Sequence, residues 1–370
     1  MRNRNEIPTR LGRRLMALGL GSAVAVGGLV ALAPASPASP STASSGDFNE
    51  PGNMVIADQF NNRIVEIQGH RVVWQFGNGS SVATPQSIVG PNDVERVGDL
   101  TLISGTGTPA GADPSCTNPS GCADNRVLLV DREGHIVWQY GQAGVTGSAE
   151  NQLNTPVQST ALPDRDVLIT DQGNSRVIEV NHDHEVVWQY GMTGTPGAGF
   201  DQLNNPNSAE LLPNGHILIA DENNNRVIEV NRDHEIVWQY GSPSDTTTLN
   251  GAAFASRLPN GHTLITDSNN NRVVEVSQGK SVVWSYVTNT RPGSMANPLP
   301  TRAVRLEDGN TLISDQFNDQ VIEVNRHHQI VFSQGQIQVD GNGPDQLNAP
   351  YDAKVVGDYT GLTFPGGDSR

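Results

Sequence analysis

The chain has 370 residues, 36% of them hydrophobic, and 39 are glycines, a composition typical of a folded protein rather than a disordered chain. With 23 basic and 39 acidic residues its formal net charge is −16, which excludes a nucleic acid partner because phosphates are bound by surplus Lys and Arg. Only Lys280 and Lys354 are lysines, so the chain has no polybasic patch for an anionic membrane.

The N-terminal segment predicts export. Five arginines, ending with the adjacent Arg13 and Arg14, precede an uncharged run over residues 15–32, and small residues follow in an A-x-A-like pattern. We therefore expect a signal peptide over residues 1–35, an Ala/Pro/Ser-rich linker over 36–50, and a secreted chain without a membrane span. The alternative is that the apolar run remains as an N-terminal membrane anchor.

The only two cysteines, Cys116 and Cys122, lie in a stretch over residues 105–125 that predicts an irregular insertion. In an exported chain such a pair favours a disulfide that closes a small loop. A metal site would need further ligands, and no histidine or additional cysteine is near in the sequence.

A repeated unit occupies the remainder of the chain. Its marker residues are spaced by 63, 50, 50, 46 and 48 residues, and the long first interval contains the cysteine pair. A tryptophan follows each marker arginine after 11 or 12 residues, and Phe332 takes the sixth tryptophan position. The markers are Arg63, Arg126, Arg176, Arg226, Arg272 and, in place of an arginine, Gln320.

Each unit predicts four short strands. In the fourth unit the first strand covers residues 206–212, and the next three read HILIA, RVIEV and EIVWQY. These β-branched runs are separated by turn residues such as Pro-Asn-Gly at 213–215. A period of 45–50 residues with four strands per unit indicates a β-propeller blade.

The blade count follows from the two ends of the repeat region. Six pairs of third and fourth strands occur, but residues 51–55 align with a second strand, so the first blade lacks its own first strand. Residues 350–356 supply a spare first strand. We therefore predict an all-β, six-bladed β-propeller of four-stranded blades over residues 51–356, closed by pairing the N- and C-terminal strands and followed by a tail over 357–370.

The unit P-N-G-x-I-L-I-A-D-x-x-N-N-R-V-I-E-V, preceded by Gln-Leu-Asn-x-Pro, resembles the NHL repeat over nearly all of residues 51–356. The recurring I-V-W-Q-Y-G is also similar to repeats of arylsulfotransferase-like and pyrroloquinoline-quinone-type propellers. The resemblance implies a propeller family that contains lyases, lactonases and pure binding domains, so it does not choose among these functions.

The antiparallel strand order predicts which loops share a face. We name the face with the between-blade loops and the second–third turns the top, and the opposite face the bottom. All nine histidines fall in bottom turns, where we expect solvated side chains rather than a metal site. The resemblance implies axial histidines for an amidating lyase or an arylsulfotransferase, and this chain places none there. The histidines are His70, His135, His182, His184, His216, His234, His262, His327 and His328.

Two repeated features predict fold devices, because a reactive centre needs only one copy. An Asp precedes the second–third turn and an Arg follows it after five residues, as in Asp221 and Arg226. We expect the Asp to accept backbone N–H groups of its turn and the Arg to reach back to it. The tryptophan column predicts packing between blades, with carbohydrate stacking as the alternative.

A ligand site should use residues that differ from blade to blade. The polar residues at the start of the first strands vary in this way, so these positions are the candidate ligand site. We expect them at the top mouth of the axis. Asp93 and Asp352 come from neighbouring blades and predict a Ca²⁺ site; alternatives are that Arg302 neutralises Asp352, or that the mouth is only hydrated. The candidates are Asn92, Asp93, Glu95, Gln158, Asn207, Ser208, Arg302 and Asp352.

The favoured function is an extracellular binding module that recognises a protein, a glycan or a small molecule through its top face. The alternative is an enzyme with an axial carboxylate site, a metal-assisted lyase or lactonase, or less favourably an arylsulfotransferase-like protein. The sequence assigns no catalytic residue and no cofactor other than the calcium ion.

Overall fold

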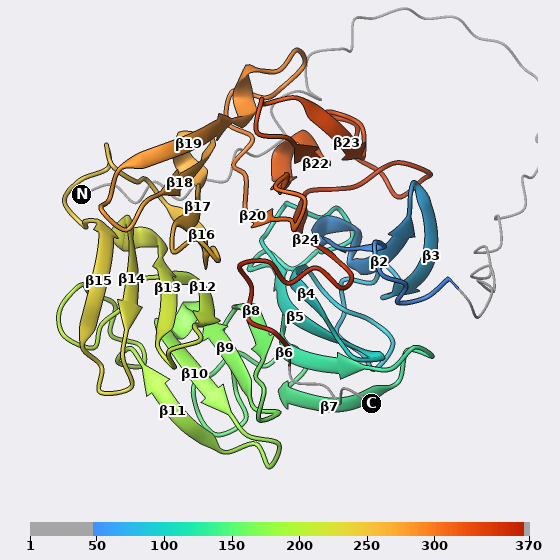
Figure 1. The fold of residues 1–370 in the computed structure, drawn as a ribbon. Coiled ribbons are helices and arrows are strands. Elements are labelled where there is room, and N and C mark those ends of the chain that lie inside the picture. The colour runs from blue at the N-terminus through green and yellow to red at the C-terminus, as the bar shows by residue number, and fades with distance from the viewer. Residues whose placement is uncertain (1–46, 366–370) are drawn as a thin grey trace, which may run out of the picture.

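The computed structural model describes residues 47–365 and shows six four-stranded antiparallel sheets arranged as a ring (Figure 1). The predicted six-bladed propeller is therefore confirmed. The predicted signal peptide and most of the predicted linker lie outside the described residues. Within residues 47–365, no helix is long and apolar enough to cross a membrane.

The first strand of every blade lies beside the central axis (Figure 1). Four of these strands begin at a proline, whose missing N–H group is tolerated at the start of a strand. From blade one to blade six the first strands are β24 (Pro350–Val355), β4 (Pro91–Val97), β8 (Pro156–Ala161), β12 (Pro206–Leu211), β16 (Ala252–Arg257) and β20 (Arg302–Arg305).

The second and third strands carry the Ile/Val/Leu runs and are buried on both faces, because each sheet is covered by the sheets on either side. The second strands are β1 (Met54–Asp58), β5 (Leu100–Thr108), β9 (Val167–Asp171), β13 (Ile217–Asp221), β17 (Thr263–Asp267) and β21 (Thr311–Asp315). The third strands are β2 (Arg63–Gln68), β6 (Cys122–Val130), β10 (Arg176–Val180), β14 (Arg226–Val230), β18 (Arg272–Val276) and β22 (Gln320–Val324).

The fourth strands form the outer rim of the ring (Figure 1) and expose apolar residues such as Val187 and Val237. They are β3 (Arg71–Phe76), β7 (Ile136–Gly141), β11 (Val186–Tyr190), β15 (Ile236–Gly241), β19 (Val282–Val287) and β23 (Ile330–Gln334). Short 3₁₀ segments occupy the second–third turns of five blades and one between-blade loop: η2 (Gln59–Asn61), η3 (Gln172–Asn174), η4 (Glu222–Asn224), η5 (Ser268–Asn270), η7 (Gln316–Asn318) and, in the loop, η6 (Thr288–Thr290).

The ring closes as predicted, through a sheet with strand order β24-β1-β2-β3. β24 and β1 are antiparallel, and their register runs from Met54 opposite Val355 to Asp58 opposite Pro350. The strand that completes blade one therefore comes from the other end of the repeat region. Closure removes the two open sheet edges that an unclosed ring would leave.

The apolar core is divided into clusters that lie between neighbouring blades. In one cluster Val177 and Tyr190 of blade three pack with Ile219 and Ile228 of blade four, all of them buried. Each blade is thus stabilised mainly through its two neighbours, and the loss of one blade exposes apolar surface on two others.

The insertion in blade two is more regular than predicted. β5 and β6 continue their ladder beyond the other blades, pairing Gly107 with Ala123 and Thr108 with Cys122. The predicted disulfide joins Cys116 to Cys122 at the end of this extended hairpin. Residues 105–108 and 122–125 therefore belong to strands, and the irregular part is confined to the loop between them.

Candidate binding sites at the axis and between blades

The eight predicted ligand residues do gather around the axis, but they are not at a hydrated mouth. None of the eight residues is more than 4% exposed, and Asp93, Ser208 and Asp352 have no exposed surface at all. Their contacts are with one another, with backbone groups and with side chains of neighbouring blades. Ligand binding at these residues stays a prediction, and their burial changes how it must be tested.

Four of the eight residues join one blade to the next. Each lies two residues after the Pro position of its first strand. Its side chain accepts a hydrogen bond from the backbone N–H of the residue that lies three after the Pro position in the next blade. Asp352 accepts from Val94 N at 3.1 Å, and Asp93 accepts from Ser159 N at 3.2 Å. The same pattern continues with Gln158 and Ala209 N at 2.8 Å, and with Ser208 and Ala255 N at 3.2 Å. This column therefore has a structural role that the sequence comparison between blades did not show.

The ammonium of Lys354 occupies the position between Asp93 and Asp352. Its Nζ lies 2.9 Å from Asp93 Oδ1, 2.6 Å from Asp352 Oδ2 and 2.8 Å from the carbonyl oxygen of Val94. A lysine at this point already supplies the positive charge that the two carboxylates require. The residues as arranged do not fit a calcium ion, whose oxygen ligands would have to surround the position that Nζ takes.

The cluster of two carboxylates and one ammonium has a net negative charge when all three groups are ionised. Burial raises the pKa of Asp93 to about 7, with Lys354 acting in the opposite direction and Asp352 adding to the rise. The pKa of Lys354 is raised above its ordinary value because Asp352 and Asp93 outweigh the effect of its burial. Lys354 therefore stays charged, while Asp93 is the member that gains a proton as the pH falls.

One alternative predicted from the sequence is that Arg302 neutralises Asp352. In the structure Arg302 binds other groups. Its guanidinium is 1% exposed and crosses the axis to donate to Asn207 Oδ1 at 2.9 Å and to the carbonyl oxygen of Ala253 at 3.1 Å. It also donates to the carbonyl oxygens of Val157 and Asn207 at 3.2 and 3.1 Å. Arg302 thus ties blades three, four and five to its own blade six.

The second–third turns supply further axial side chains that the sequence did not single out. Gln316 donates to Gln59 at 2.8 Å, and Gln59 donates to Asn92 at 2.7 Å across three blades. Half-buried Glu222 accepts from Asn207 at 2.8 Å, and burial raises its pKa. Gln59, Glu222 and Gln316 each directly follow the Asp of the second–third turn, so the sequence contains a pattern that identifies them. Only the closed ring shows that these turns meet at the axis.

The C-terminal tail covers the bottom end of the axis, and its described part crosses the centre of the ring in Figure 1. Thr363 donates to Glu210 Oε2 through its backbone N at 2.8 Å and through Oγ1 at 2.7 Å. Asp358 accepts from Glu307 N of blade six at 2.7 Å. With Lys354 and Arg302 inside and the tail below, the axis is a packed polar core rather than an open channel.

The repeated Asp–Arg pair is a fold device, as predicted, although its contacts differ in detail. Asp221 accepts from Arg226 Nε at 2.7 Å and from Asn224 at 2.7 Å. Its other oxygen accepts from Asn204 N at 2.8 Å, in the loop before the first strand of the same blade and not in the turn. The pair thus fastens the between-blade loop to the second strand.

Blades two and six lack one member of the motif and restore the ion pair from elsewhere. In blade two Asp124, on the third strand, lies 2.6 Å from Arg126 Nε. In blade six Arg291, from the loop before the first strand, pairs with Asp315. All six blades therefore contain this ion pair with its carboxylate fully buried, which supports a structural role.

Replacing Asp221 by Ala should destabilise the protein by about 3–5 kcal/mol, because it leaves the buried Arg226 guanidinium without its carboxylate. Urea denaturation followed by tryptophan fluorescence measures the change. Asp233→Ala, an exposed turn substitution in the same blade, is the matched control and should have little effect. Equal stability of the two variants would contradict the structural role of the pair.

The histidines occupy bottom turns as predicted, but several are packed rather than freely solvated. His234 of blade four lies edge-on to Trp188 and Tyr190 of blade three, with ring centroids 5.8 and 5.6 Å apart. His262 instead lies 2.7 Å from Glu275 of its own blade. These contacts repeat around the ring, so they hold neighbouring blades and turns together.

On the bottom face, the fourth-strand aromatic residue of each blade packs against the next blade, and we call the position between the two blades a groove, whether it is filled or open. In the grooves after blades one, four and five, an arginine at the end of the next first strand lies over the tryptophan and binds a third-strand glutamate. The arginine carbon Cζ is 4.7, 5.0 and 5.3 Å from the ring centroid for Arg96 over Trp74, Arg257 over Trp238 and Arg305 over Trp284.

Two further grooves are filled in other ways. After blade three, Arg232 from the third–fourth turn of blade four lies 5.1 Å from the Trp188 centroid and binds Glu179 at 2.5 Å. After blade two, Trp138 is itself buried against Ala161 and Val167. Five of the six grooves are thus closed by side chains of the protein.

Among residues 47–365, nothing fills the groove between blade six and blade one in this way. Phe332 replaces the tryptophan, Val355 takes the position of the first-strand arginine, and Gly69 takes the turn position of Arg232. A cavity of about 670 Å³ results, and its floor is apolar. Glu323 and the turn carboxylates Glu307, Asp308 and Asp358 line its sides. We name it the six–one groove; its floor residues are Met54, Ile67, Leu306, Phe332 and Val355.

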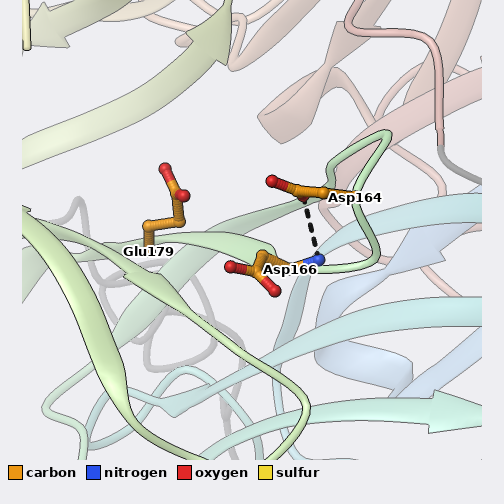
Figure 2. A group of neighbouring side chains, drawn as sticks. All are labelled: Asp164, Asp166 and Glu179. Carbon is orange, nitrogen blue, oxygen red and sulfur yellow. Dashed lines mark hydrogen bonds between the residues drawn. The ribbon is translucent and has the colours of Figure 1, made fainter.

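One acidic cluster lies elsewhere on the bottom face. Asp164 and Asp166 belong to the turn after β8, and Glu179 lies on β10 (Figure 2). Carboxylate oxygens of the three residues lie within 4.8 Å of one another. Glu179 is already paired with Arg232, and Asp164 accepts the N–H of Asp166 at 3.2 Å. These contacts account for the cluster as a turn and a groove ion pair.

Comparison with known proteins supports the fold and the repeat type. A family model described as outer membrane protein assembly factor BamB matches residues 123–332, which is more than half of the chain. No curated protein matches the chain.

Many solved structures are similar in fold. A protein of unknown function from Bacteroides caccae is 14% identical, with 82% of this chain and 98% of that chain covered and a TM-score of 0.57. A streptogramin B lyase is 13% identical, with 79% and 80% covered and a TM-score of 0.50. A virginiamycin B lyase from Staphylococcus aureus is 12% identical, with 76% and 79% covered and a TM-score of 0.49. At these identities the likeness to the first two structures shows the propeller fold alone.

Proposed function

The chain belongs to the β-propeller repeat family whose model is described as outer membrane protein assembly factor BamB, and from that premise we propose that it is an extracellular binding module that engages a partner through the six–one groove. The observation that carries the proposal is that, in the part of the chain that the structure describes, this one of the six grooves lacks the side chains that close the others. A recess of about 670 Å³ with an apolar floor and polar rim has the character of a binding site.

This proposal moves the binding surface away from the top mouth of the axis. The axial side chains bind each other and the backbone, so a ligand there would have to replace existing buried contacts. The six–one groove is already accessible. Binding in it requires only the displacement of water from apolar surface, which is favourable.

Extracellular location is part of the proposal and is supported by the Cys116–Cys122 disulfide, since such bonds persist in oxidising compartments. The repeats themselves support NHL type within the wider propeller family, through their P-N-G-x-I-L-I-A-D-x-x-N-N-R-V-I-E-V consensus. Neither statement is needed for the groove to bind a partner.

The enzyme alternative has less support. The lyases among the similar structures share the fold, and their chemistry does not follow from it. In this chain the axial carboxylates Asp93 and Asp352 bind Lys354, and all nine histidines lie in turns of the bottom face. A free base or nucleophile at the axis would require this network to open.

Selection of short randomised peptides displayed on phage against the full chain tests the proposal. Peptides that bind should lose affinity for Val355→Arg, which fills the six–one groove with the side chain that the closed grooves carry at this position. Val187→Arg is the matched control, because it makes the same substitution at a rim position that is 51% exposed. Melting temperatures establish that each variant is folded.

Selected peptides that bind Val355→Arg as tightly as the unaltered chain would contradict the proposal. So would peptides whose binding is instead lost with Glu222→Gln, because Glu222 lies at the top of the axis, on the opposite face. A selection that yields no binders also counts against a peptide-binding groove.

A further inference from the structure

We infer that the six–one groove receives an arginine side chain of a partner protein, which stacks on Phe332 and pairs with Glu323. The inference rests on the proposed function, because it names the occupant of the same groove. It is drawn from how the protein closes its other grooves with its own arginines.

The grooves after blades one, four and five share one arrangement of three groups. In the groove after blade four, Arg257 lies over Trp238 and donates to Glu229 Oε2 at 2.9 Å. Glu229 Oε1 meanwhile accepts from Asn214 of its own blade at 3.2 Å. The glutamate is therefore held from one side by its own turn and completed from the other side by an arginine of the next blade.

The groove after blade five repeats the arrangement. Arg305 lies over Trp284 and donates to Glu275 Oε2 at 2.9 Å. Glu275 Oε1 is held by His262 at 2.7 Å. The separate roles of the two glutamate oxygens are thus the same in both grooves.

In the six–one groove the glutamate and the ring are present without the arginine. Asn310 donates to Glu323 Oε1 at 2.6 Å, as Asn214 does to Glu229. No basic side chain between residues 47 and 365 forms an ion pair with Glu323. Phe332 has its ring stacked on His70 at 5.1 Å, and it also lines the groove. Two of the three groups are in place, and the third is missing.

The surrounding charge favours a cation. Glu307, Asp308 and Asp358 line the same groove, and both oxygens of Asp358 already accept backbone N–H groups, so it stays in position. Arg326 of blade six lies near Gly309 but does not line the groove. An acidic or phosphorylated partner would meet four carboxylates, whereas an arginine meets complementary charge.

Arginine fits this groove better than lysine. Its flat guanidinium can stack on Phe332 while its N–H groups bind Glu323, which a compact ammonium cannot do together. The apolar floor, which includes Met54 and Ile67, suits the aliphatic part of an arginine and a neighbouring apolar side chain. The cavity of about 670 Å³ has room for both.

Binding of the full chain to an array of short peptides tests the inference. The peptides have randomised flanks and one central position that carries Arg, Lys, citrulline or Glu. Citrulline has nearly the shape of arginine without its charge. The arginine pool should be bound about tenfold more tightly than the citrulline pool, with lysine between them and glutamate weakest.

Three variants locate the effect, and a fourth is the control. Val355→Arg should abolish the arginine preference. The double variant Met54→Thr/Val355→Arg fills the groove in a second way, because Met54 lies opposite Val355 on the neighbouring strand. In blades two and six the residue opposite the arginine is a threonine, Thr101 opposite Arg96 and Thr311 opposite Arg305. Glu323→Gln should reduce the arginine preference while the floor remains intact. Val187→Arg should leave all pools unchanged.

Equal binding of the arginine and citrulline pools, or of neither pool, would overturn the inference. If the phage-selected peptides depend on the open groove yet show no arginine preference, the proposed function stands and this inference fails. If an arginine preference persists in Val355→Arg, the arginine is bound elsewhere and this inference fails, while the groove dependence of the phage-selected peptides decides the proposed function separately.

Discussion

Deleting residues 346–370 is expected to leave no stable monomeric fold. The deletion removes β24, which pairs with β1 from Met54 to Asp58 and completes blade one. It also removes Tyr351, Asp352 and Lys354 from the axial network and exposes apolar surface on blades one, two and six. Circular dichroism melting and size-exclusion chromatography should show an aggregated or unfolded chain.

Two shorter deletions separate closure from the tail. Deleting residues 366–370 should leave the melting temperature unchanged. Deleting residues 358–370 keeps β24 but removes the hydrogen bonds between Thr363 and Glu210, so the protein should fold with a lower melting temperature. A chain without residues 346–370 that melted like the full chain would show that blade one does not need its C-terminal strand.

Replacing Lys354 by Met should cost about 3–5 kcal/mol of the free energy of unfolding at about pH 8. The reason is that Asp93 and Asp352 would remain buried beside one another without their cation. Lys280→Met is the matched control, since Lys280 is the only other lysine and lies exposed in a turn. Urea denaturation should show a large loss for the first variant and almost none for the second.

The loss should be smaller in acid. Burial raises the pKa of Asp93 to about 7 from the ordinary 3.8, so between these values the folded state binds more protons than the unfolded state. The contribution of Asp93 to the free energy of unfolding therefore falls as pH rises through that window. In Lys354→Met, Asp93 loses the attraction of Lys354, which opposes the rise in its pKa. The free energy of unfolding of this variant therefore depends more strongly on pH.

Unfolding measured at about pH 5 and about pH 8 should thus show a smaller difference between Lys354→Met and the unaltered chain at the lower pH. Adding Asp93→Asn to Lys354→Met should recover part of the stability at the higher pH, because one uncompensated charge is gone. A loss that is the same at both pH values would show that Lys354 acts by packing alone.

Much of the architecture could be predicted from the sequence because a propeller blade is a local structure. The marker arginines and tryptophans placed the third and fourth strands, and the proline positions placed the first strands. The same count predicted that residues 350–356 complete blade one, and it placed every histidine on one face. These features depend on strand order and turn chemistry within a unit of about 50 residues.

The six–one groove also has a signal in the sequence. Phe332 is the exception in the tryptophan column. Five residues after the Pro position, Arg96, Arg257 and Arg305 recur, and Val355 stands in the same column. What the column alone does not give is which blade each arginine contacts, because the partner glutamate lies on the preceding blade.

Only the tertiary structure decided the state of the axis. The sequence placed Asp93 and Asp352 in neighbouring blades and suggested an exposed site, but Lys354 lies 261 residues from Asp93 and its ammonium meets it only when the ring closes. The same holds for Arg302, which binds groups of three other blades. Repeat periodicity determines the blade, because its contacts are local. Burial and charge pairing at the axis depend on six distant strands meeting at one line, and no pattern within a single repeat contains that information.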